Sequence, residues 1–117
     1  MKVDIKRVYE PPSPEDGRRI LVDRLWPRGL TKADARIDHW AKGTSPSNEL
    51  RKWYKHDPAN WEEFKRRYFA ELDSLPDAVR SLLDNVLDGK VTFLYSSKKK
   101  ELNNAVALRE YLESRGK

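Results

Sequence analysis

The feature that most constrains the fold is an uninterrupted apolar run, Ile20-Leu21-Val22, inside the segment 19–25. A strand with one face in water alternates apolar and polar residues, whereas a strand covered on both faces carries apolar residues at successive positions. The run therefore predicts a central strand in a parallel sheet. Residues 91–95, Val-Thr-Phe-Leu-Tyr, are rich in β-branched and aromatic side chains and predict a second buried strand.

Three other segments predict an edge strand, a loop and a less defined stretch. Residues 2–9 alternate, with Val3, Ile5 and Arg7 on one face, which is typical of a strand with one half-solvated side, placed at the edge of a sheet. Residues 10–17 hold three prolines and a glycine and predict a loop. Residues 35–42 predict either a short strand or an extended loop.

Two helices are predicted in the middle of the chain. Ser45-Pro46 resembles an N-cap followed by proline at the first helical position, opening a short helix that runs through Tyr54. Asp57-Pro58 repeats this punctuation. Between Trp61 and Leu75 the apolar residues recur at steps of three or four, which places them on one face of a second helix.

Two more helices are predicted toward the C-terminus. Leu75-Pro76 opens the first of these, whose apolar face runs from Val79 to Leu87. Gly89 follows at the position where a left-handed C-terminal cap is expected. The second runs from Leu102 to Leu112.

This order of elements predicts the α/β class, with a small, mostly parallel sheet covered by about four helices, because parallel neighbours need crossover connections. A chain of 117 residues suits a single compact domain, so we expect residues 1–117 to form one. Ligands of such sheets bind beyond the carboxyl ends of the strands. The segments 23–29 and 95–104, which are polar after an apolar strand, are therefore the candidate site.

Composition excludes several kinds of chemistry. The chain has no cysteine, which rules out a disulfide, a thiolate nucleophile, a zinc finger and an iron–sulfur cluster. The two histidines, His39 and His56, have no metal-ligand spacing, so we expect no metal site and no cofactor. Neither a signal peptide nor a membrane span is evident, which predicts a cytoplasmic protein without a membrane partner. The net charge of +5 favours an acidic partner without identifying one.

The segment 23–29 holds one carboxylate, two guanidinium groups and an indole after the central strand. Arginine suits two-pronged capture of phosphate or carboxylate, so Arg24 and Arg28 are candidate anion ligands with Trp26 as a wall of the pocket. The structural alternative is an ion pair between Asp23 and an arginine, with Trp26 filling the core.

The segment 95–104 leads from a strand into a helix. Tyr95 and Ser96 could donate hydrogen bonds to an anion near the start of that helix, and Asn104 could orient a ligand by its amide. The alternative is a simple capped turn, because the glycines of a phosphate-binding loop are absent. If the protein is an enzyme, the candidate catalytic residues are Asp23, Tyr95, Ser96 and His56, the last as a general base beside Asp57.

A second hypothesis is a nucleic-acid-associated basic module. Its candidate contacts are the basic residues Lys65, Arg66, Arg67, Lys98, Lys99 and Lys100. However, Glu62 and Glu63 lie four residues before Arg66 and Arg67, a pairing typical of an ordinary solvated helix face. No helix-turn-helix or RNA-recognition signature is present.

Several segments carry a resemblance to a known family: residues 6–9, 21–29 (Leu-Val-Asp-Arg-Leu-Trp-Pro-Arg-Gly), 49–53, 94–96 and 103–106. Together they resemble the YeaO-like bacterial proteins, domain-of-unknown-function family 488, nearly from end to end. The resemblance implies a small intracellular α/β domain without an assigned activity.

Longer relatives in the wider family are similar in order to rhodanese-like domains and carry a cysteine at the late strand end, where this chain has Tyr95-Ser96. Sulfur transfer and cysteine phosphatase chemistry are therefore not expected, because both need the thiolate. Some members have histidine where Asn104 stands, so a catalytic base is not expected there.

The favoured hypothesis is a domain that binds, or acts on, a small anionic ligand bearing phosphate or carboxylate at the strand ends. The alternatives are the nucleic-acid module and a protein-interaction domain without a small ligand. We expect a monomer or a weak dimer.

Overall fold

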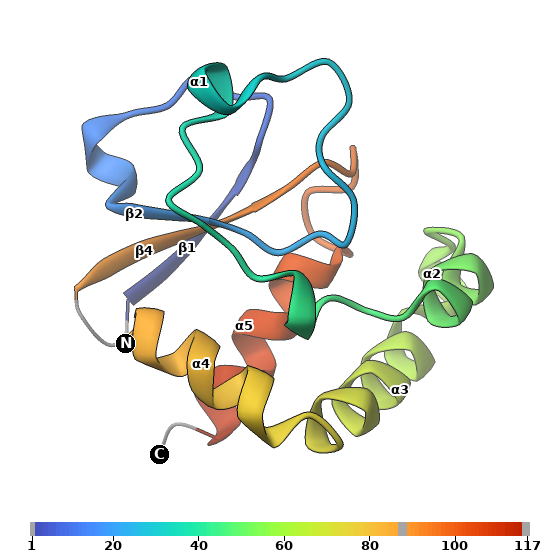
Figure 1. Ribbon diagram of the computed structural model, residues 1–117. Coiled ribbons are helices and arrows are strands. Elements are labelled where there is room, and N and C mark those ends of the chain that lie inside the picture. The colour runs from blue at the N-terminus through green and yellow to red at the C-terminus, as the bar shows by residue number, and fades with distance from the viewer. Residues whose placement is uncertain (1, 87–88, 116–117) are drawn as a thin grey trace.

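Strand β4 (Lys90–Tyr95) lies inside a parallel sheet that the described residues build in the order β1-β4-β2-β3. The computed structural model describes residues 2–115 except 87 and 88. Its other strands are β1 (Lys2–Arg7), β2 (Arg18–Leu21) and β3 (His39–Trp40). All three pairings are parallel, so the carboxyl ends of the strands lie at the same end of the sheet, as Figure 1 shows.

The α/β class, the edge strand and the two buried strands are confirmed. β1 is an edge strand of the sheet, whereas β2 pairs with a strand on each side, β4 and β3. The side chains of β4 are buried from Val91 onward. β2 is shorter than predicted: Val22 still donates its N–H to the carbonyl of Leu94, but Asp23 then turns away to bond Ser96. The segment 35–42 contains the two-residue strand β3.

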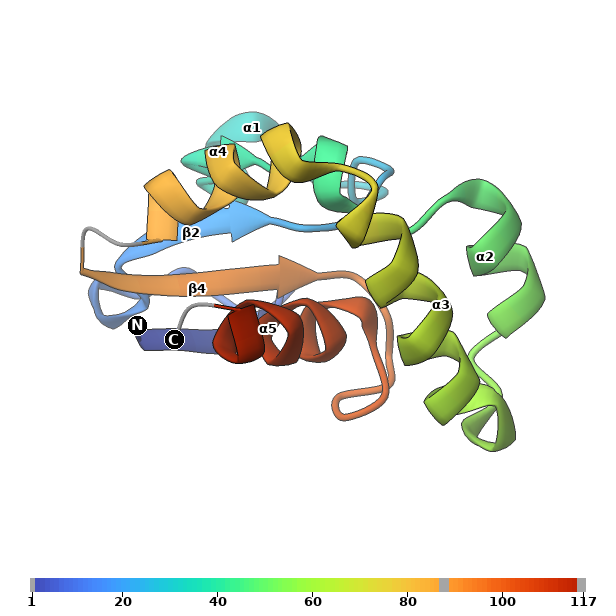
Figure 2. The same cartoon turned by 90° about the horizontal axis from the view of Figure 1, so that it is seen from below.

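Five helices accompany the sheet in the described residues: α1 (Lys32–Ala35), α2 (Asn48–Tyr54), α3 (Trp61–Asp73), α4 (Pro76–Val86) and α5 (Asn104–Arg115). Short 3₁₀ turns lie at Pro14–Asp16, Lys42–Thr44 and Pro58–Asn60. Figure 1 shows α4 and α5 on one face of the sheet, below the strands, and Figure 2, seen from that side, shows α4 next to β2 and α5 next to β4. α1 and the loops around it lie on the opposite face, as Figure 1 shows.

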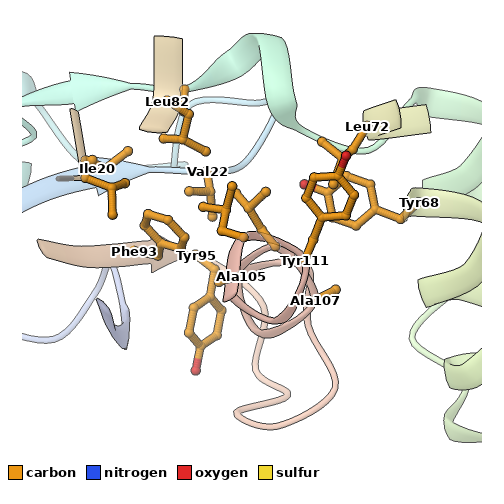
Figure 3. Close-up of a cluster of buried hydrophobic side chains, with 14 of the residues drawn as sticks. Ile20, Val22, Tyr68, Leu72, Leu82, Phe93, Tyr95, Ala105, Ala107 and Tyr111 are labelled. Atoms are coloured by element: carbon orange, nitrogen blue, oxygen red, sulfur yellow. The ribbon is translucent and has the colours of Figure 1, made fainter. Parts of the chain in front are cut away.

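The apolar run of β2 is explained by two cores, one on each face of the sheet. Ile20 and Val22 face the helices and belong to the larger core, which includes Leu82 of α4 and Leu108 of α5. Figure 3 shows part of this core. Leu21 faces the other way, into a smaller core built with Val8, Leu94 and the half-buried Trp26, Leu30, Ile37 and Trp40.

The predicted start of α2 is wrong by two residues. Its N-cap is Ser47, whose hydroxyl oxygen accepts from the N–H of Leu50 at 3.1 Å, rather than Ser45. The Ser47 N–H and hydroxyl also donate to the Glu71 carboxylate of α3 at 2.9 and 2.6 Å. Ser45 instead closes the preceding 3₁₀ turn by donating to the Lys42 carbonyl. A contact distant in sequence thus selects between two serines that are two residues apart.

Of the other helix boundaries, the starts of α3 and α4 agree with the predictions, whereas α3 ends at Asp73 rather than Leu75 and α5 begins at Asn104 rather than Leu102. Asp57 caps the turn before α3 by accepting from the N–H of Ala59, and Pro76 is the first residue of α4. Gly89 has a positive φ of 107°, as expected after a helix end. Leu87, predicted on the apolar face of α4, lies outside the described residues.

Gly17 leads into β2 with a φ of 65°. A Cβ atom there would overlap the main-chain oxygen of Lys90, whereas one on Gly29, whose φ is 85°, would meet nothing. We predict that Gly17→Ala lowers the free energy of unfolding by about 2 kcal/mol more than the control Gly29→Ala, because only Gly17→Ala adds steric overlap to the backbone strain. Urea unfolding measures both, and equal losses would contradict the prediction.

A buried ion pair ties the loop before β2 to the sheet. The Asp16 carboxylate lies 2.5 Å from the Arg19 guanidinium and 3.1 Å from the Lys6 ammonium. Burial raises the pKa of Asp16, but hydrogen bonds from the Ser13 N–H and from Lys6 and Arg19 outweigh it and hold the pKa below its ordinary value. The carboxylate form is thus the one that stabilises the fold.

We predict that Asp16→Asn costs about 3 kcal/mol at neutral pH, because it leaves the buried Arg19 without a counter-charge. A lowered pKa gives stability that is present above the ordinary pKa of 3.8 and is lost as the pH falls through the folded value. The gap between wild type and variant should therefore narrow below pH 4 in urea unfolding. A gap that widens with acid would contradict this assignment.

Candidate functional site

A pocket of about 670 Å³ lies where the carboxyl ends of β1, β2 and β4 meet α2. It is lined by the residues that follow each strand and by side chains from α2 and from the turn before α3. Figure 1 shows the loops after β2 and β4 at the same end of the sheet, on the side of α2 and α3. This is where a parallel α/β sheet places its ligands.

Two arginines of the pocket are held by main-chain carbonyls. Arg7, the last residue of β1, donates to the carbonyls of Ser97 and Ser96 at 2.8 and 2.9 Å. Arg24 donates to the carbonyls of Pro46 and Ser45 at 3.0 and 3.4 Å. These hydrogen bonds orient both guanidinium groups. Because carbonyls carry no net charge, the bonds do not compensate the positive charge of either arginine.

Three more cations line the pocket: Arg28, Arg51 and Lys98, all with exposed side chains. Arg51 donates to the Asn48 side chain at 3.2 Å. None of the five cations of the lining forms an ion pair with a described residue. Asp23 is the one carboxylate among the lining residues that the structure describes. The pocket therefore carries a large excess of positive charge.

Asp23 connects the loop after β2 to the loop after β4 and to α5. Its Oδ2 accepts from the N–H and the hydroxyl of Ser96 at 2.9 and 2.8 Å, and its Oδ1 accepts from the Asn104 amide at 3.0 Å. The Asn104 amide also donates to the Val22 carbonyl at 3.1 Å. In the described part of the chain Asp23 thus has no arginine partner, unlike in the structural alternative considered above.

Aromatic side chains form much of the remaining lining. Trp26 is half-buried, donates its indole N–H to the Leu30 carbonyl at 2.7 Å and packs edge-on against Trp40 with 5.5 Å between ring centroids. Tyr54 and Phe64 are buried and stack at 4.3 Å. The pocket therefore pairs cationic groups with fixed apolar surfaces.

His56 lies at the mouth of the pocket after α2, with a left-handed φ of 56°. Its Nδ1 is 3.5 Å from the hydroxyl oxygen of Ser97, not of Ser96. The hydroxyl of Ser96 donates to Asp23. His56 thus neighbours Ser97 rather than Ser96, the serine named above as a candidate catalytic residue.

The structure brings together all but one of the residues predicted for the strand-end site, and adds Lys98 from the nucleic-acid hypothesis. Those that line the pocket are Asp23, Arg24, Trp26, Arg28, His56, Ser96, Lys98 and Asn104. Tyr95 does not line it: its side chain is 2% exposed and belongs to the larger core, as Figure 3 shows. Burial raises the pKa of the Tyr95 hydroxyl.

Sequence reasoning missed Arg7, Tyr9, Arg51 and Tyr54. Arg7 had a usable signal, because it ends a strand parallel to residues 91–95 and must therefore reach the same edge of the sheet. Arg51 and Tyr54 lie on a short helix whose position is set by its contact with α3, and no local pattern indicates that contact.

The basic residues of α3 lie outside the pocket and are paired with carboxylates. Lys65 contacts Glu110 and Glu62, while Arg66 and Arg67 both contact Glu63 at 2.5 and 2.8 Å. The hydrogen bonds from Arg66 and Arg67 lower the pKa of Glu63 to about 2. The predicted pair Glu63–Arg67 is confirmed. The predicted pair Glu62–Arg66 is wrong, because Arg66 contacts Glu63 and Glu62 contacts Lys65.

Neither a metal cluster nor a membrane-spanning helix is found in the described residues. No three side chains of the types that bind metals gather there. No helix there has the length and the apolar character needed to cross a bilayer.

Comparison with known proteins shows similarity to proteins without an assigned function. The family model described as the inactive DUF488-N3 subclade matches residues 2–117. The uncharacterized protein YeaO of Escherichia coli K12 is 41% identical over 114 residues, covering 97% of this chain and 99% of its own. Uncharacterized proteins of Mycobacterium bovis and Mycobacterium tuberculosis H37Rv are each 51% identical over 71 residues, 61% of this chain and 60% of theirs. No solved structure gives a significant match.

We predict that Asp23→Asn destabilises the protein by about 1–3 kcal/mol, because its new NH₂ group would face the NH₂ of Asn104 or the donors of Ser96. The control is Asp57→Asn, since asparagine and aspartate cap a helical turn about equally well. Urea unfolding measures both variants. If the two variants unfold at the same urea concentration, Asp23 does not organise the site as described.

Proposed function

The chain belongs to the YeaO-like proteins of domain-of-unknown-function family 488, and from this premise we propose that it binds a small anionic ligand, bearing phosphate or carboxylate, in the strand-end pocket. Arg7 and Arg24 would hold the anion, and Arg28, Arg51 and Lys98 would close around it. Charge-assisted hydrogen bonds from guanidinium groups are among the strongest polar contacts available to a protein.

The observation that carries the proposal is the set of five cations that surround one pocket without an ion pair among the described residues. Clustered like charges repel one another and lower the stability of the folded chain unless an anion joins them. Two of the guanidinium groups are also fixed before any ligand arrives, which reduces the entropic cost of binding.

The same residues support binding more than catalysis. Two of the candidate catalytic groups, Asp23 and Ser96, bond to each other and thereby organise the site. The matching family model is described as an inactive subclade. We therefore propose a binding domain, with His56 and Ser97 as the groups to examine if turnover of a ligand is ever observed.

The nucleic-acid alternative has less support, because the charges of Lys65, Arg66 and Arg67 are balanced by neighbouring carboxylates. Lys98 lines the pocket and is followed by the exposed Lys99 and Lys100, and three consecutive residues do not make a track across the surface. Such a track is the usual footprint of a protein that follows a nucleic-acid backbone.

Titration with inorganic phosphate, followed by two-dimensional amide NMR, tests the proposal. We predict shifts at residues 23–29 and 96–98 that sodium chloride of equal ionic strength does not produce. Arg28→Gln/Arg51→Gln should weaken phosphate binding at least tenfold, because each lost contact to a charged group is worth about 1.5–3 kcal/mol.

The control for this variant is Arg18→Gln/Arg80→Gln, which removes the same charge from exposed positions outside the pocket. It should bind phosphate within about twofold of wild type if the contacts are local, since distant surface charges are screened by salt. Equal losses in both double variants, or shifts that chloride reproduces, would show that the pocket is not an anion site.

A further inference from the structure

We propose that the ligand is a free mononucleotide, with its phosphate on the arginines, its base against Trp26 and one of its N–H or O–H groups donating to Asn104. This inference rests on the proposed anion site and assigns the class of molecule that occupies it. Three features of the pocket support it: its volume, its fixed aromatic wall and an unused acceptor.

The volume is too large for a bare anion. Pockets of roughly 300–1,000 Å³ hold organic ligands, and this one measures about 670 Å³. A phosphate ion on Arg7 and Arg24 would leave most of that space to water. A sugar and a base attached to the phosphate would fill the remainder.

The aromatic wall provides a surface on which a base can stack. The indole of Trp26 is held by two contacts: its N–H donates to the Leu30 carbonyl, and its ring packs edge-on against Trp40. It lines the pocket in the same loop as Arg24 and Arg28. Every base has a π-face, and stacking on an aromatic side chain strengthens binding by roughly tenfold or more.

The acceptor is the side-chain oxygen of Asn104. The amide nitrogen of this residue donates to the Val22 carbonyl and the Asp23 carboxylate, both of which can only accept. The orientation of the amide is therefore determined, and its oxygen has no partner among the described residues. A ribose hydroxyl or a base N–H in the pocket could donate to it.

The surroundings of the pocket favour a free nucleotide over a strand of nucleic acid. The basic face of α3 is covered by its own carboxylates, as described above. The uncompensated cations of the described lining gather around one pocket, which suits one nucleotide rather than a continuous backbone.

The test compares AMP and UMP with ribose 5-phosphate, phenyl phosphate, inorganic phosphate and a single-stranded oligonucleotide by calorimetry and amide NMR. We expect at least one nucleotide to bind about tenfold more tightly than ribose 5-phosphate, because only the nucleotide carries a base. Phenyl phosphate offers a ring and a phosphate without the further donors, so it should bind more weakly than that nucleotide.

Variants of Trp26 assign the effect to stacking. Trp26→Leu should remove the preference for the nucleotide over ribose 5-phosphate, whereas Trp26→Phe, which keeps an aromatic face, should retain most of it. The amide spectrum of each variant reports whether it folds. The comparison of ligands on the wild-type protein tests the inference even if Trp26→Leu does not fold.

The outcomes separate this inference from the proposal beneath it. If ribose 5-phosphate and inorganic phosphate bind but no nucleotide binds more tightly, the anion site stands and the mononucleotide is wrong. Phenyl phosphate that equals the nucleotides would also overturn it. An oligonucleotide that binds more tightly, with a steep loss in salt, would assign the site to nucleic acid. If none of the anions binds, both proposals fail.

Discussion

The carboxylate of Asp23 is the group on which the rest of the site depends. It joins the loop after β2 to the loop after β4 and to the first residue of α5, which the sequence separates by more than seventy residues. A partly buried carboxylate is costly unless donors surround it, and here three N–H or O–H groups do so. These three donors are neutral, and among the described residues Asp23 forms no ion pair with the arginines of the pocket.

The arginines of the pocket are therefore held in place by main-chain carbonyls rather than by carboxylates. The carbonyls that hold Arg7 and Arg24 orient the guanidinium groups but do not cancel their charge. A fold that only needed these arginines for packing could pair each with a carboxylate, as it does for Arg19 with Asp16 and for Arg66 with Glu63. The contrast within one small chain indicates that the pocket stores an unbalanced charge, which a bound anion would balance while stabilising the fold.

The sequence predicted the strands and the main helices because their signals are local: an apolar run in 20–22, a β-branched run in 91–95 and regular apolar spacing in α3. The prediction from sequence was wrong where a tertiary contact determines the position of a residue, as at the start of α2. Ser47 caps α2 because the Glu71 carboxylate of α3 holds it, and nothing near Ser45-Pro46 reveals that. Arg51 enters the pocket for the same reason, since the position of α2 depends on α3.

The position of Tyr95 shows how finely the strand ends separate core from site. Successive residues of a strand point to opposite faces, and both faces of this sheet are covered. Phe93 and Tyr95 therefore enter the larger core, and Leu94 enters the smaller one. The first side chain free of both cores is that of Ser96, just as Asp23 is the first after the buried Val22. Two adjacent strands thus deliver one polar group each to the same point, where the two groups bond. At both strands the pocket lining begins at the first residue after the buried ones. A shift of one residue in the end of either strand would replace a polar side chain of the pocket by a side chain of the core.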